Sequence, residues 1–140
     1  MLAKILAISS TLALLVWMGF FLMGSLPLMV LKHDTPLDGR FIRGLFNVYY
    51  GAVLATAAIA AVGHALSARP AIALAMLGIA ALSVLSRHWM LAQMDRARNS
   101  ILMEDPAAIW QFRRLHIGGM LLNVVQLAII CVGMTKLDFV

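Results

Sequence analysis

Four long stretches without a charged residue dominate the pattern of the chain: 5–31, 44–68, 70–86 and 115–135. A helix needs about 20 largely apolar residues to cross the hydrocarbon core of a bilayer. The third stretch reaches that length when residues 87–91 extend it. In lipid, backbone groups must find their hydrogen bonds within the spanning segment, so each stretch predicts a transmembrane helix.

The predicted fold is therefore a single all-α domain, residues 1–140, that forms an integral membrane four-helix bundle with antiparallel neighbours. The spans are expected at about 5–31, 44–68, 70–91 and 113–135. The first apolar stretch is far longer than the core of a cleaved signal peptide, which has about 7–15 residues. We therefore expect it to remain as a helix.

Composition supports a lipid surrounding. Apolar residues make up 63% of the chain and charged residues 12%, compared with about 45–50% and about 25% in soluble domains. A soluble fold of this length would have too little interior for so much apolar surface. The single cysteine, Cys131, lies within the fourth span, so no disulfide within the chain is possible.

The turns and helix ends are also predicted. The sequence "SARPAI" joins spans two and three with almost no loop, and "DTPLDG" indicates a turn before re-entry. Asp105 is typical of an N-cap and Pro106 of a first helical position, so the fourth helix should begin near Pro106. The segment "SRHWMLAQMDRARNS" should prolong the third helix past the membrane surface, with Asp95 and Arg98 paired at i,i+3.

Small residues at i,i+4 spacing favour close helix packing in lipid. Gly51 and Ala55 form such a pair in the second span, and Ala71 and Ala75 form another in the third. We expect these pairs to lie in the contacts between helices.

Positive charge predicts the orientation. Of the 11 Lys and Arg residues, eight lie in the first and third connections or at the helix ends beside them. These are Lys32, Arg40, Arg43, Arg87, Arg96, Arg98, Arg113 and Arg114. The positive-inside rule places these connections in the cytoplasm and both termini outside (N-out/C-out), in a bacterial inner membrane.

The net charge of +5 does not indicate nucleic-acid binding, because the basic residues flank the spans and form no aromatic-interleaved stripe. Membrane lipids, including anionic lipids of the cytoplasmic leaflet, are the expected partners of these residues. Trp89 and Trp110 fall at the same predicted boundary, where an amphipathic ring suits the headgroup region.

A polar row crosses the cytoplasmic half of the predicted bundle. Arg113, His116 and Asn123 share one face of the fourth helix, with Gln126 beside them. The corresponding residues elsewhere are Arg43, Asn47 and Tyr50 on the second helix and Arg87 and His88 on the third. Ionisable groups within a membrane usually face the bundle interior and are candidate functional residues.

Several interpretations of this row remain open. Its amides can cross-link helices and its arginines can meet headgroups, which would make the row structural. His88 and His116 are candidate haem ligands, with Arg available for the propionates. Arg43, Arg87 and Arg113 could together hold an anionic lipid or organic anion. We expect no metal site, because the histidines and methionines are scattered.

The last third of the chain carries a family resemblance. The sequence "FRRLHIGGMLLNVVQLAIICVGM", preceded by "RHWMLAQMDRARNSILMEDP", resembles the four-span membrane proteins similar to transmembrane protein 205, a domain of unknown function. Phe112, His116 and Asn123 match the motif of that family, and Gly19 and Gly24 match its glycine-bearing first span. The resemblance implies a membrane protein with no established reaction.

A second resemblance concerns "RFIRGLFNVYYG", which is similar to four-span bacterial protoporphyrinogen oxidases that bind haem. Those proteins carry a histidine near the start of the first span, where this chain reads "KILAISST". Haem or porphyrin handling is therefore kept as an alternative.

No hydrolase, kinase or zinc motif occurs in the sequence. The function predicted first is that of a small polytopic membrane protein without evident catalysis. It would act as an accessory or stabilising subunit of a larger membrane complex, as a homo-oligomer, or as a tolerance factor.

Overall fold

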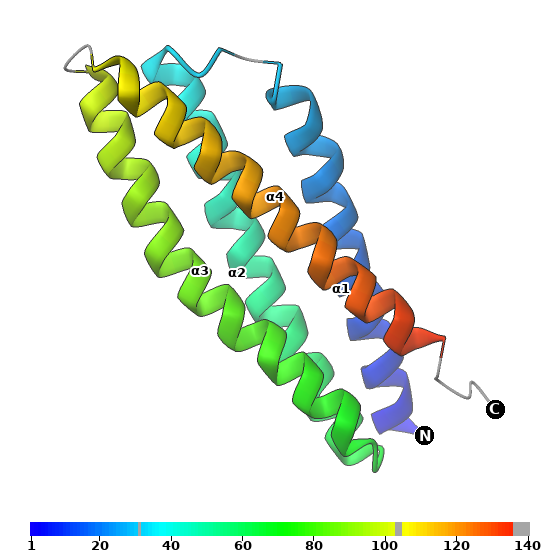
Figure 1. The fold of residues 1–140 in the computed structure, drawn as a ribbon. Helices are drawn as coiled ribbons and strands as arrows, with labels where there is room; N and C mark the ends of the chain where they lie inside the picture. The colour runs from blue at the N-terminus through cyan, green and yellow to red at the C-terminus, as the bar shows by residue number, and fades with distance from the viewer. Residues whose placement is uncertain (31, 103–104, 136–140) are drawn as a thin grey trace.

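Four α-helices make up the computed structural model, which describes residues 1–30, 32–102 and 105–135. They are α1 (Leu2–Leu28), α2 (Pro36–Leu66), α3 (Pro70–Leu102) and α4 (Pro106–Met134) (Figure 1). The predicted all-α four-helix bundle is confirmed. Each helix is long and apolar enough to cross a membrane.

Polar caps and prolines fix the starts of two helices. The hydroxyl of Thr35 accepts a hydrogen bond from the Asp38 amide at 3.2 Å, directly before Pro36. The carboxylate of Asp105 accepts one from the Ala107 amide at 3.0 Å, directly before Pro106. The predicted start of the fourth helix is thus confirmed, because cap and proline act together there.

The helices extend further than the uncharged stretches that predicted them. α2 begins at Pro36, before the predicted span that starts at residue 44, and α3 continues to Leu102, past its predicted span, as the sequence indicated. A helix of 33 residues is about 50 Å long, whereas the hydrocarbon core is about 30 Å thick. Residue 31, the predicted end of the first span, lies outside the described residues; α1 ends at Leu28.

Consecutive helices are neighbours, and α4 also contacts α1, which closes the bundle. The start of α1 and the last described residues after α4 lie at the end of the bundle that holds the α2–α3 connection (Figure 1). α3 and α4 are close at their connection and spread apart toward the end with the termini (Figure 1).

Two glycines mark the closest helix contacts. A Cβ at Gly63 would lie 2.7 Å from the backbone nitrogen of Ala7, so α1 and α2 touch backbone to backbone there. A Cβ at Gly119 would overlap the ring of Phe46, so this glycine makes room for an aromatic side chain of α2. The helices approach at these points because glycine has no side chain.

The predicted small-residue pairs do not make these contacts. Ala55, Ala71 and Ala75 are exposed, and a Cβ at Gly51 would meet no atom within 4 Å. The prediction was wrong because i,i+4 spacing identifies a face of a helix without identifying which face turns inward.

An aromatic cluster fills the centre of the bundle. Phe21 of α1 stacks on Tyr49 of α2 with ring centroids 4.0 Å apart, and it meets Phe46 edge-on at 4.9 Å. Tyr50 packs beside Phe46 and Tyr49. These buried rings position the polar groups described next, because Tyr49 and Phe46 also contact α4.

Candidate functional site

A chain of hydrogen bonds ties α4 to α1 and α2 within the bundle. The amide nitrogen of Asn123 donates to the Tyr49 hydroxyl at 2.7 Å and to the Met18 carbonyl at 3.4 Å. The Tyr49 hydroxyl in turn donates to Gln126 Oε1 at 3.4 Å. Asn123 is 0% exposed and Gln126 is 3% exposed. The Asn123 nitrogen and the Gln126 oxygen therefore bind other helices within the protein, whereas Asn123 Oδ1 is buried without a hydrogen-bond partner among the described residues.

Two histidines form the other buried contact of α4. Nε2 of His33 lies 3.1 Å from Nδ1 of His116, and both residues are almost fully buried. The ring of Phe46 meets His116 edge-on, and Phe112 lies beside His33. His33 stands in the α1–α2 connection with a φ of 63°, in the left-handed region. One ring donates and the other accepts, so the pair fastens this connection to α4.

This pair does not fit a haem. Two axial ligands on opposite faces of an iron would place their nitrogens about 4 Å apart, at about 2 Å from the metal each, whereas 3.1 Å is a direct hydrogen bond. His88, the predicted second ligand, is exposed on α3, whereas His116 is fully buried against His33. Among residues 1–30, 32–102 and 105–135, no three His, Cys, Asp or Glu side chains gather as metal ligands.

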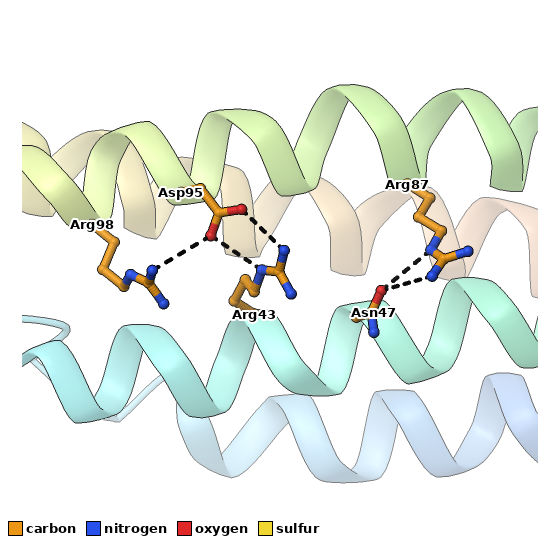
Figure 2. A network of polar contacts seen from close by, with 5 residues as sticks. All are labelled: Arg43, Asn47, Arg87, Asp95 and Arg98. Atoms are coloured by element: carbon orange, nitrogen blue, oxygen red, sulfur yellow. Dashed lines mark hydrogen bonds and ion pairs between the residues drawn. The ribbon is translucent and has the colours of Figure 1, made fainter.

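A second polar group lies on the seam between α2 and α3 (Figure 2). Arg43 of α2 donates from Nε and Nη2 to the two carboxylate oxygens of Asp95, at 3.1 and 3.0 Å. The predicted partner of Asp95, Arg98, approaches the same carboxylate at 3.9 Å. Further along the same seam, Arg87 of α3 donates two hydrogen bonds to Oδ1 of Asn47 on α2.

The structure divides the predicted site residues into three groups. Tyr50, His116 and Asn123 are buried, and the Tyr50 hydroxyl donates to the sulfur of Met90 at 3.2 Å. Arg43 and Asn47 are half-buried on the seam with α3, where Arg87 joins them. Exposed residues are Arg87, His88 and Arg113. The three arginines predicted to hold one anion are thus placed differently: Arg43 and Arg87 bind side chains of the seam, whereas Arg113 lies on α4.

Sequence reasoning missed His33, Tyr49 and the role of Asp95. The position of Tyr49, beside the predicted Tyr50, carried a usable signal, because both hydroxyl groups fall within the predicted span 44–68. His33 carried none, because it lies in a connection where helical periodicity does not place a side chain.

Comparison of the chain with protein-family models, with curated proteins and with solved structures finds no match.

Proposed function

We propose that this chain is a non-catalytic accessory protein of a membrane, which stabilises a larger membrane complex through its lipid-facing surface. One observation carries the proposal: the buried polar groups bind one another. Asn123, Gln126 and His116 are each at most 3% exposed, and each makes a hydrogen bond to another part of the chain. We also propose a relationship to the four-span family that Phe112, His116 and Asn123 resemble.

The outer face of α2 is the surface that we assign to a partner. A shallow depression of about 500 Å³ lies on it, lined by Leu37, Arg40, Phe41, Gly44, Leu45 and Val48. A Cβ at Gly44 would meet no atom within 4 Å. A second helix can therefore approach this face closely, and close approach is a main source of helix association in lipid.

Photo-crosslinking tests this assignment. p-Benzoylphenylalanine replaces Val48 in the depression or, as the control, Leu121, an exposed residue of α4. We expect irradiation of intact membranes to join the Val48 variant to one protein at a fixed ratio and the Leu121 variant mainly to lipid. Crosslinks to lipid alone at both positions would contradict the accessory role.

The proposal includes the location and orientation of the chain. We infer a bacterial inner membrane, with the α1–α2 and α3–α4 connections in the cytoplasm and both termini outside. The support is the distribution of charge, since eight of the 11 Lys and Arg residues flank these two connections.

Anionic lipid binding is a second candidate, favoured by a groove at the connection end of α3 and α4. The groove has a volume of about 530 Å³ and is lined by Trp89, Gln93, Ala107, Trp110, Gln111 and Arg114. Indole rings suit the headgroup region, and a guanidinium binds phosphate through paired N–H donors. Arg114 therefore takes the place that the sequence had assigned to Arg43, Arg87 and Arg113.

Retention of lipid tests the second candidate. The protein is purified in mild detergent with phosphatidylglycerol and its bound lipid is measured by native mass spectrometry. We expect Arg114→Gln to lower retention and Arg96→Gln, at another exposed arginine, to leave it unchanged. Equal retention by both variants would show that the groove does not select an anionic headgroup.

A further inference from the structure

A crevice of about 220 Å³ lies between the diverging parts of α3 and α4, in the half of the bundle near the termini. Its walls are apolar and include Ala75 and Met76 of α3 and Ile130 and Gly133 of α4. Two polar side chains also line it, Thr11 of α1 and His64 of α2. This site is separate from the buried polar groups that contain His116 and Asn123.

The polar side chains form the deep part of the crevice. His64 is 0% exposed and Thr11 is 1% exposed, whereas Ala71 and Ala75 are exposed and lie at the mouth. Since the outer surface of these helices is apolar, the mouth would face acyl chains. A molecule that reaches His64 would therefore enter from the bilayer.

The hydrogen bonds of Thr11 determine the tautomer of His64. The Thr11 hydroxyl donates its one hydrogen to the Ala7 carbonyl at 2.7 Å. The contact of 3.1 Å between Thr11 Oγ1 and His64 Nε2 then requires the imidazole to donate from Nε2. A neutral imidazole that carries its hydrogen on Nε2 has a bare acceptor at Nδ1.

This acceptor is unsatisfied within the protein. His64 Nδ1 is buried and has no hydrogen-bond partner among the described residues. A buried acceptor without a partner is costly, and most such groups in proteins are paired. His64 lines the crevice, so a molecule that fills the crevice would lie against its side chain.

We propose that the crevice binds a membrane-dissolved apolar molecule that carries a hydroxyl group on a ring, and that the hydroxyl donates its hydrogen bond to His64 Nδ1. The chemistry of the site selects both parts of this ligand. The apolar walls match a hydrocarbon ring, and the bare acceptor matches an O–H donor, not a carbonyl. The inference does not depend on the accessory role proposed above.

The volume agrees with a single substituted ring. A protein cavity of about 150 Å³ with apolar walls holds a benzene molecule, and the crevice is larger by about half. The crevice extends along α3 from Ala71 to Ile79, about 12 Å at the rise of an α-helix. A longer apolar substituent would leave through the mouth into the acyl chains.

A pair of probes of matched shape tests the proposal. 4-Fluorophenol carries the hydroxyl, and 4-fluorotoluene carries a methyl group in its place. Binding of each to the full chain in lipid nanodiscs is followed by ¹⁹F NMR, with empty nanodiscs to correct for partition into lipid. We expect saturable binding of both probes, with the phenol roughly threefold to tenfold tighter, the range for one neutral hydrogen bond.

Three variants identify the site. His64→Phe keeps a ring but removes the acceptor, and it should abolish the preference for the phenol. Gly133→Leu should fill the crevice and remove saturable binding of both probes. Gly118→Leu, on the same helix, is the matched control, because a Cβ at either glycine meets no atom within 4 Å. The glycine pair therefore keeps the test valid if the His64 variant does not fold.

Each result is decisive. Saturable binding that prefers the phenol and disappears in Gly133→Leu alone supports the proposal. It is overturned if both probes only partition into lipid as they do in empty nanodiscs, if the phenol and the toluene bind equally, or if Gly133→Leu binds as Gly118→Leu does.

Discussion

The imidazole of His33 lies against that of His116, with 3.1 Å between Nε2 of the first and Nδ1 of the second. The contact joins the α1–α2 connection to α4, two parts of the chain 83 residues apart. It therefore holds the first helix pair and the last helix together at the connection end of the bundle.

We expect the two histidines to be energetically coupled. His33→Gly removes the imidazole ring without straining the backbone, because glycine readily adopts the φ of 63° found at this position. In a double-mutant cycle with His116→Leu, the free energies of unfolding should show a coupling of about 1 kcal/mol, the contribution of one hydrogen bond. Unfolding is followed by circular dichroism as SDS is titrated into mild detergent micelles.

His88→Leu is the control for this cycle, since His88 is exposed on α3. It should leave stability and its response to His33→Gly unchanged. Additive effects of the His33 and His116 substitutions would show that the two rings do not depend on each other.

Gly119 should tolerate no side chain. A Cβ there would overlap the Phe46 ring and lie 3.0 Å from the sulfur of Met90, so Gly119→Ala should lower the free energy of unfolding by about 1–3 kcal/mol. Gly118→Ala, where a Cβ meets no atom within 4 Å, is the neighbouring control. If overlap is the cause, Phe46→Leu should recover part of the loss in Gly119→Ala, and an absence of recovery would refute that explanation.

The fold could be predicted because lipid imposes a length and a composition on every span. The start of α4 followed from Asp105 and Pro106 for a local reason, a side-chain cap next to a fixed φ. The predicted span 44–68 did not give the start of α2, because Arg40 and Arg43 interrupt the apolar pattern before it. Both residues lie on the part of α2 that precedes the uncharged stretch, where a helix no longer needs an apolar surface.

The candidate site was predicted only in part. Helical periodicity placed His116 and Asn123 on one face, and both are buried. Periodicity gives no information on how one helix is rotated relative to another. It therefore grouped Arg43 and Arg87 with these residues, although the two arginines bind Asp95 and Asn47 on the seam. Tertiary packing of the whole bundle decides that rotation.

The ion pair of the seam should contribute little to stability. The side chains of Arg43 and Asp95 are 35% and 36% exposed. Ion pairs with this degree of exposure contribute about 0–1 kcal/mol to stability, because solvent screens them. Arg43→Gln should therefore lower the free energy of unfolding by less than about 1 kcal/mol, and added salt should reduce the difference. Asp95→Asn should have the larger effect, because it leaves both Arg43 and Arg98 without the carboxylate. A large loss in Arg43→Gln that salt does not change would contradict this view.

The proposed orientation rests on the positive-inside rule and can be tested with single cysteines. Cys131 is exposed and is first replaced by serine. Cysteines are then placed at Asp34, in the α1–α2 connection, and at Ala68, in the α2–α3 connection; both positions are exposed. A membrane-impermeant maleimide added to intact spheroplasts should label Ala68→Cys alone, and it should label both variants after the membrane is permeabilised. The second condition shows that each thiol is reactive.

Labelling of Asp34→Cys alone would reverse the orientation, and labelling of both in intact spheroplasts would mean that α2 does not cross the membrane.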